Sequence, residues 1–194
     1  MDAFLNYLCK NSDVFVLRDS TALQYCYDLT RFSDEIILAG PINASEDLHS
    51  IVKSFCLEND ISYVTDIYNS KEAQFHLIYK EESHSLKVEF KQLLNEEEIV
   101  RFDQYNTYSI NDIFMKKTRQ FSYHKRIRDL YDIVYICENY WDILDQRLID
   151  SMKDSFFYLE YDFFEMIFAT QVDELIDTKQ LKKDFNKVWK KIGF

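Results

Sequence analysis

The sequence predicts an α+β protein in which a mixed β-sheet with flanking helices is followed by a C-terminal helical bundle. Between residues 61 and 91, apolar and polar residues alternate as in half-buried strands. From Ser109 onward, apolar residues recur at helical spacing almost without interruption. We therefore expect an α/β core over residues 1–95 and a helical domain over residues 96–194 packed on that core.

The first part of the chain is expected to form a strand–helix–strand unit between two further helices. Gly40 and Pro41 close the second strand, because this pair favours a turn. Asn43 lies three residues before Glu46, as at a capped helix start. In chain order, we expect a helix over 2–10, a strand over 14–17, a helix over 21–27, a strand over 36–39 and a helix from about 43 to 57.

Three further strands complete the expected sheet, and five helices follow. The strands are predicted over 61–68, 73–79 and 85–91, and the polar residues 80–84 would join the last two as a hairpin. Ser109 with Asp112 resembles a capping box at the start of the first helix. The helices are expected over 109–121, 127–140, 141–153, 159–176 and 179–192.

The composition excludes several classes of protein. The 194 residues include only two glycines, Gly40 and Gly193, so glycine-rich phosphate loops are ruled out. No run of about 18 apolar residues occurs and the N-terminus lacks the pattern of a signal peptide, so we expect a cytoplasmic protein without membrane contact. The four cysteines are scattered without paired spacing, which argues against a disulfide framework or a zinc knuckle.

A basic strip lies within an acidic chain of net charge -11. Residues 116–128 contain six basic side chains and no acid. One interpretation is a solvated helix face. The other is a contact with phosphate or RNA, because concentrated positive charge attracts polyanions.

The segment FVLRDSTALQYCYDLTRFSDEIIL, residues 15–38, resembles the signature of a known family. It is similar to FVLKGGTALALxYGxxRFSEDIDL of the AbiE-type (AbiEii/AbiGii) toxins, which are nucleotidyltransferases of type IV toxin–antitoxin systems. The matching positions are Phe15, Leu17, Thr21, Ala22, Leu23, Tyr25, Arg31, Phe32, Ser33 and Leu38. The resemblance implies a nucleotidyltransferase-like mixed sheet.

A second segment, INDIFMKKTRQFSYHKRIRDLYDIVYI over residues 110–136, is similar to a helical segment of the same family. By this resemblance Lys117, or Lys116 in an alternative alignment, and Arg128 contact nucleotide phosphates. Asp129 and Asp132 match acids that orient those cations or assist the acceptor. For Asp132, a helix-surface charge or an internal ion pair is an equally weighted alternative. The two motifs together cover roughly residues 12 to 140.

Nucleotidyl transfer needs Mg²⁺ to neutralise the triphosphate, and carboxylates at positions i and i+2 of a strand point to the same side, where they can bind metal. The Asp-x-Asp pair of the family aligns with Glu35-Ile36-Ile37, in which Ile37 cannot be a ligand. In a frame shifted by one residue, Asp34 pairs with Ile36 and points to the other face. Glu89 aligns with the third carboxylate and is expected opposite Glu35, which leaves a site of two acids and one metal ion.

The second departure from the family pattern is at the turn after the first strand, where Asp19 and Ser20 replace two glycines. The hydroxyl of Ser20 can donate to a phosphate oxygen. The carboxylate of Asp19 adds repulsion toward a triphosphate, on the order of 1 kcal/mol at ~4 Å in water.

The resemblance implies a toxin-like enzyme that transfers a nucleotide from an NTP to an acceptor such as tRNA. Such an enzyme would use Mg²⁺ held by Glu35 and Glu89, and an antitoxin would be encoded nearby. The alternative is a catalytically degenerate fold without cofactor that acts as a binding or regulatory module, because Asp19 and Ile37 remove two features of the chemistry. A third hypothesis treats the acidic, aromatic C-terminal bundle as a protein-docking surface.

Overall fold

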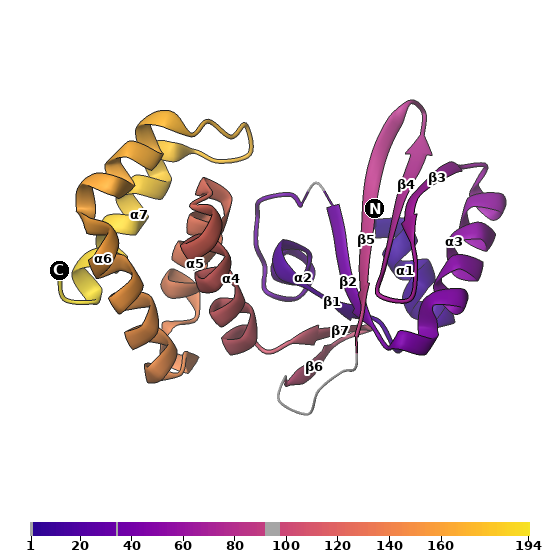
Figure 1. Ribbon diagram of the computed structural model, residues 1–194, viewed down its shortest axis with the longest axis horizontal. Coiled ribbons are helices and arrows are strands. Elements are labelled where there is room, and N and C mark those ends of the chain that lie inside the picture. Colours follow the sequence, from indigo (N-terminus) through magenta and orange to yellow (C-terminus); the bar gives the residue numbers. More distant parts are fainter. Residues whose placement is uncertain (1, 34, 92–97) are drawn as a thin grey trace. The chain divides into compact units, whose positions relative to one another are not determined.

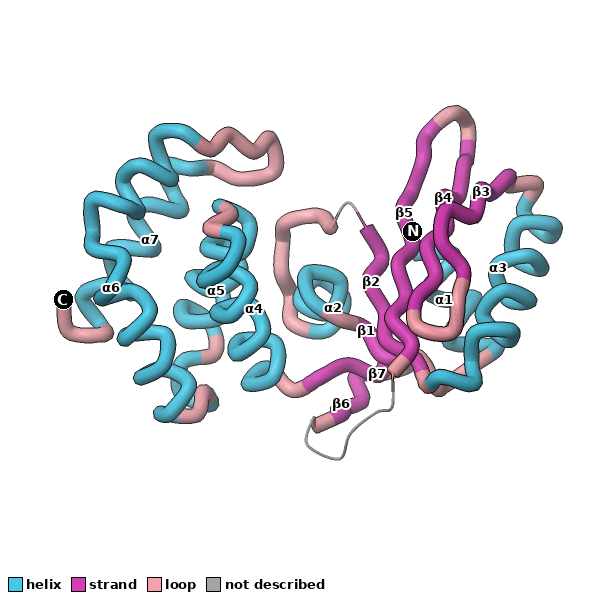
Figure 2. The backbone as a smooth tube through the Cα atoms, viewed as in Figure 1, coloured by secondary structure: helices cyan, strands magenta, loops and turns pink. Residues whose placement is uncertain are grey.

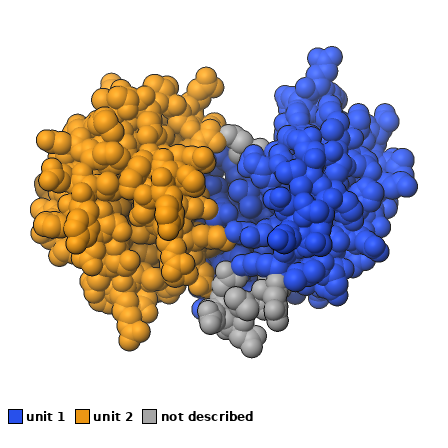
Figure 3. All heavy atoms as spheres, viewed as in Figure 1, with its two compact units in different colours: residues 1–109 blue, residues 110–194 orange. Residues whose placement is uncertain are grey.

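A computed structural model describes residues 2–33, 35–91 and 98–194. The chain divides into two compact units, Met1–Ser109 and Ile110–Phe194 (Figure 3). The first contains a mixed sheet with helices and the second is helical, as the sequence predicts. The predicted domain boundary at residues 95–96 lies outside the described residues, and the observed division falls after Ser109.

The described residues of the first unit form a seven-stranded sheet and three helices (Figure 1). Its helices are α1 (Asp2–Asn11), α2 (Asp19–Cys26) and α3 (Ser45–Asn59), and a short 3-10 turn, η1 (Ile42–Ala44), precedes α3. Its strands are β1 (Val16–Leu17), β2 (Glu35–Gly40), β3 (Ser62–Tyr68), β4 (Glu72–Tyr79), β5 (Glu82–Phe90), β6 (Ile99–Phe102) and β7 (Tyr105–Tyr108).

The strands follow the order β3-β4-β5-β2-β1-β7-β6 across the sheet (Figure 2). The pairs β2–β5 and β1–β7 are parallel, and the other neighbouring pairs are antiparallel. The hairpin of β6 and β7 is not among the predicted elements. Its strands have only four residues each and contain Arg101, Asn106 and Thr107, so they lack the apolar alternation that reveals the longer strands.

The sheet has helices on both faces: Figure 1 shows α2 on one side and α1 with α3 on the other. The side toward α1 and α3 forms the core. There the ring of Phe75 stacks 6.1 Å from His49 of α3, and Phe4 of α1 meets Phe55 edge-on at 5.2 Å. Leu86 and Val88 of β5 are buried on this side, so the alternate residues of β5 point to the side of α2.

The second unit consists of four helices and a 3-10 turn: α4 (Ile110–His124), α5 (Ile127–Asn139), η2 (Trp141–Ile143), α6 (Gln146–Thr170) and α7 (Thr178–Lys191). Two helices were predicted over 141–153 and 159–176, but α6 covers 146–170, spans the predicted gap and has non-helical backbone angles at Glu160, with φ 57° and ψ 157°. Phe121, Phe156 and Phe164 are fully buried in the core of this unit. Among the described residues, no helix has the length and apolarity needed to cross a membrane.

Candidate functional site

The turn from β1 into α2 places an acid where the family signature has glycine. Asp19 is the first residue of α2 and has a left-handed backbone, with φ 52°. Glycine adopts this conformation without steric cost, and aspartate tolerates it better than most residues. The Asp19 carboxylate is buried at the positive end of α2, and its Oδ2 lies 4.0 Å from Nε of Arg18. An internal anion therefore occupies a position suited to phosphate.

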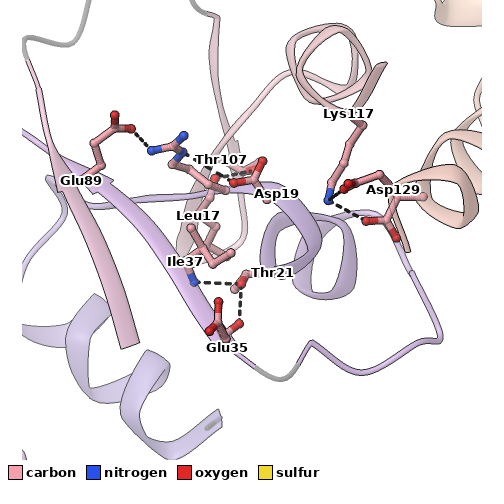
Figure 4. A network of polar contacts seen from close by, with 11 residues as sticks. Leu17, Asp19, Thr21, Glu35, Ile37, Glu89, Thr107, Lys117 and Asp129 are labelled. Carbon is pink, nitrogen blue, oxygen red and sulfur yellow. Dashed lines mark hydrogen bonds and ion pairs between the residues drawn. The ribbon is translucent and has the colours of Figure 1, made fainter. Parts of the chain in front are cut away.

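Thr21 of α2 fixes the start of β2. Its Oγ1 accepts a hydrogen bond from the backbone N–H of Ile37 and donates one to the carbonyl of Glu35, both at 3.0 Å (Figure 4). On this edge of β2, strand β1 pairs with Leu38 and Ala39. The Thr21 hydroxyl thus takes over the role of a strand partner where β1 ends. It holds the backbone that carries the candidate metal ligand.

The Arg-Phe-Ser part of the signature stabilises the loop before β2. The hydroxyl of Ser33 donates to the carbonyl of Glu35 at 2.7 Å, and its backbone N–H donates to Oε1 of Gln24 at 2.8 Å. The buried Arg31 donates to the carbonyl of Phe32 at 3.1 Å and to the hydroxyl of Ser20 at 3.2 Å. These signature residues build the site rather than reach into it, and Ser20, a predicted nucleotide contact, belongs to this network.

Glu35 lies on the α2 side of the sheet, in contact with a cation on the neighbouring strand. The register of the parallel pair β2–β5 sets Glu35 beside Ser85 and Ile37 beside Lys87. The ammonium Nζ of Lys87 lies 2.6 Å from Oε1 of Glu35, and 42% and 35% of the two side chains are exposed. The carboxylate is therefore accessible to solvent and already paired.

Glu89 does not lie opposite Glu35, contrary to the prediction from the sequence. The register sets Glu89 beside Ala39, four residues further along the strand pair, an offset of roughly 13 Å. Figure 4 shows the two side chains apart, with Glu89 turned to another partner. That partner is Arg18, whose guanidinium donates to the Glu89 carboxylate. The alignment with the family placed Glu89 on the same face of the sheet as Glu35, which agrees with the register, but it did not give the position of Glu89 along the strand.

These positions decide which residues fit a Mg²⁺ ion. Oxygen ligands lie 2.0–2.1 Å from Mg²⁺, so two ligands of one ion are at most about 4 Å apart. Glu35 and Glu89 do not meet this condition as they stand. Mg²⁺ in nucleotide enzymes is commonly held by one or two carboxylates together with substrate phosphates, and the accessible carboxylate of Glu35 fits that role alone. Asp34 lies outside the described residues, and within the described ranges no group of three or more His, Cys, Asp or Glu side chains is arranged for a metal ion.

The helical unit gathers three of the predicted site residues. Nζ of the buried Lys117 lies 2.8 Å from Oδ2 of Asp132 and 3.3 Å from Oδ1 of Asp129, and Figure 4 shows the contact with Asp129. Asp132 is fully buried. Desolvation raises the pKa of Asp129, and the nearby Lys117 opposes this shift. The structure has the internal ion pair that the sequence left open for Asp132.

The other two cations of this motif are more accessible. Arg128 of α5 pairs with Asp173 through its guanidinium, and 41% of the arginine side chain is exposed. Lys116, on α4 next to Lys117, is partly exposed. The two lysines of the alternative alignments therefore differ in kind: Lys117 is an enclosed structural cation, whereas Lys116 can reach solvent.

Sequence reasoning missed Arg18 and Lys87, the two cations beside the predicted carboxylates. A signal for Lys87 was present, because Lys87 and Glu89 are two residues apart on one strand and so share a face. What the sequence did not supply was the register between β2 and β5, which brings Lys87 rather than Glu89 to Glu35.

Several solved structures share this fold. JHP933 from Helicobacter pylori is 19% identical, with a TM-score of 0.80 over 99% of this chain and 88% of that one. MenT4, a nucleotidyltransferase toxin from Mycobacterium tuberculosis H37Rv, is 14% identical, with a TM-score of 0.51 over 89% of this chain and 64% of that one. The Megavirus polyadenylate synthase is 10% identical, with a TM-score of 0.53 over 72% of this chain and 30% of that one.

No curated protein matches the sequence. The sequence model of one family, described as nucleotidyl transferase AbiEii toxin, type IV TA system, matches residues 9–192. That range takes in the turn at Asp19, the strand of Glu35 and the buried Lys117 cluster. The chain belongs to the AbiEii nucleotidyl transferase toxin family of type IV toxin–antitoxin systems.

Proposed function

We propose that this protein binds a nucleoside triphosphate at the N-terminus of α2 and the adjoining strands β2 and β5, and transfers a nucleotide from it to an acceptor such as tRNA. The observation that carries the proposal is the placement of Glu35. Thr21 and Ser33 fix its backbone, and its carboxylate remains accessible on the α2 side of the sheet. Membership in the family supports the reaction type and implies an antitoxin partner.

In the proposed reaction an acceptor oxygen attacks the α-phosphorus. A new phosphorus–oxygen bond forms, the bond to the β-phosphate oxygen breaks, and pyrophosphate leaves with that electron pair. Mg²⁺ held by Glu35 and the phosphates would supply charge neutralisation. Asp129 and Asp132 are assigned to holding Lys117, which keeps the helices α4 and α5 in register.

A transfer assay tests this function. The protein is incubated with Mg²⁺, total tRNA and each α-³²P-labelled NTP in turn, and label on the RNA is counted. We expect labelling by the unaltered protein, at least tenfold less by Glu35→Gln, and no change in Glu46→Gln. Glu46 is the matched control because it is an exposed glutamate on α3, on the other side of the sheet. Equal labelling by Glu35→Gln and the unaltered protein would contradict the assignment.

A second candidate is a binding or regulatory module without transfer. The observation that favours it is the pair of neighbours Ile37 and Lys87, an apolar and a cationic side chain beside the one accessible carboxylate of β2. Calorimetry of NTP binding with and without Mg²⁺ separates the candidates. Metal-dependent binding that Glu35→Ala abolishes supports the enzyme, whereas metal-independent binding that survives Glu35→Ala supports the module. No binding at millimolar nucleotide rules out the enzyme.

A further inference from the structure

Lys87 pairs with Glu35, the carboxylate that fits a metal ion within the described part of the candidate site. Its Nζ is 2.6 Å from Oε1 of Glu35, so a divalent ion at Glu35 must displace the ammonium. Displacement is easy for two reasons. Large parts of both side chains are exposed, and an exposed ion pair changes an equilibrium constant by roughly fivefold at most. The lysine also has a flexible four-carbon stem that can carry its charge to a new partner.

The charges around the N-terminus of α2 suggest a new partner for the ammonium of Lys87. This end of the helix lies against β2, where the backbone N–H of Arg18 donates to the carbonyl of Ile37 at 2.9 Å. The Asp19 carboxylate sits at that helix end and repels phosphate. Lys87, beside Ile37 on the neighbouring strand, supplies a positive charge on the same stretch of sheet. It can offset the repulsion from Asp19.

We propose that Lys87 exchanges partners during substrate binding: it pairs with Glu35 in the empty site and moves to the triphosphate when a divalent ion takes Glu35. In both states each charge has a counter-charge. The carboxylate is neutralised by the ammonium before binding and by the metal ion afterwards, and the released ammonium then neutralises phosphate. The inference rests on the proposed function and names a substrate contact for it.

The exchange predicts that removing Lys87 changes two affinities in opposite directions. In Lys87→Ala, Mn²⁺ alone, measured by electron paramagnetic resonance, binds about fivefold more tightly, because the ammonium no longer competes for Glu35. Nucleotide in saturating Mg²⁺, measured by calorimetry, binds about tenfold more weakly, because a phosphate contact is lost. Lys87→Arg keeps the charge and should change nucleotide affinity by less than threefold.

Lys53→Ala is the matched control, since Lys53 is an exposed lysine on α3 on the other side of the sheet, and both affinities should be unchanged. Weaker binding of both ions and nucleotide in Lys87→Ala, or no change in either, would overturn the exchange. The transfer assay tests the proposed function separately. If the two affinities shift in opposite directions but no label reaches RNA, the exchange is supported and the transfer is refuted. If label reaches RNA but neither affinity shifts, the transfer is supported and the exchange is refuted.

Discussion

Asp19 is a residue whose backbone and side chain have opposite consequences. The backbone has a left-handed conformation, with φ 52°, which glycine adopts without steric cost. The side chain adds a buried negative charge at the start of α2, which the helix dipole favours and a phosphate does not. Aspartate in place of the signature glycine therefore adds a negative charge at a turn whose backbone angles glycine also adopts.

Replacing Asp19 separates these two effects. We expect the free energy of unfolding of Asp19→Gly to differ from that of the unaltered protein by no more than about 1 kcal/mol, because relief of the left-handed strain offsets the lost helix-end charge. Asp19→Ala should be about 1 kcal/mol less stable than Asp19→Gly, because alanine keeps the strain. Both variants should bind Mg²⁺-nucleotide about fivefold more tightly. Urea unfolding and calorimetry measure the two quantities, and equal stability of the variants would contradict the role of the backbone.

Ile37 limits the site to a single metal-binding carboxylate on β2. It shares a strand face with Glu35 at a spacing of two residues. We expect Ile37→Asp to bind Mn²⁺ about tenfold more tightly than the unaltered protein and to raise label transfer to RNA, because two carboxylates then face the same ion. Ile37→Asn, similar in size to the aspartate but uncharged, is the control. Equal Mn²⁺ affinity of the two variants would refute this account of the missing carboxylate.

At the scale of elements, the backbone at the start of β2 is hydrogen-bonded to a side chain of α2 rather than to a neighbouring strand on that edge. Thr21 is fully buried and bridges the backbone of Glu35 and Ile37 through one hydroxyl. Thr21→Val keeps the shape but leaves two backbone groups without this partner, so we expect a loss of about 1–3 kcal/mol in the free energy of unfolding. Thr21→Ser should lose clearly less. The comparison of both variants in urea tests the bridge, and a valine variant as stable as the serine variant would exclude it.

Several elements that the sequence predicted have long and regular apolar patterns. The strands β4 and β5 are eight and nine residues long and each buries three alternate apolar residues, and the helices α4, α5 and α7 bury apolar residues at helical spacing. The short β6–β7 hairpin has no such pattern and is stabilised by pairing within the sheet. The predicted gap between helices at 154–158 is helical, and the break in α6 is instead at Glu160, inside the helix predicted over 159–176.

In the candidate site, the sequence predicted the features that are local in the chain and missed the contacts between distant strands. The signature located the turn at Asp19 and the strand of Glu35, because spacing within one strand–helix–strand unit is local information. The partners Lys87 and Arg18 depend on the register of β5 against β2 and of β2 against β1, and register between strands distant in sequence is set by packing. The second motif gave Asp129 and Asp132 as acids that orient its cations, and both contact Lys117 in the structure. These residues lie within one short segment of the sequence, so their contacts do not depend on strand register.

At the scale of the whole molecule, the net charge is -11, so the acids outnumber the cations that can pair with them. In the helical unit the pairing is enclosed, with Lys117 between Asp129 and Asp132. Both carboxylates contact the same ammonium there. Burial is the main cause that raises the pKa of Asp129; the charge of Asp132 acts in the same direction, and Lys117 opposes the shift.

The raised pKa of Asp129 predicts the direction in which stability changes with pH. A carboxyl whose pKa is higher in the folded than in the unfolded state favours folding most when protonated, and that contribution is lost as the pH rises through the folded pKa. Asp129→Asn lacks the titration. We therefore expect the stability of the unaltered protein, relative to Asp129→Asn, to fall as the pH is raised from about 4 toward neutrality. Urea unfolding of both proteins at matched pH values measures the difference. If that difference instead grew with pH, Lys117 would stabilise the ionised Asp129 by more than burial destabilises it, and the cluster would be a compensated ion pair rather than a strained one.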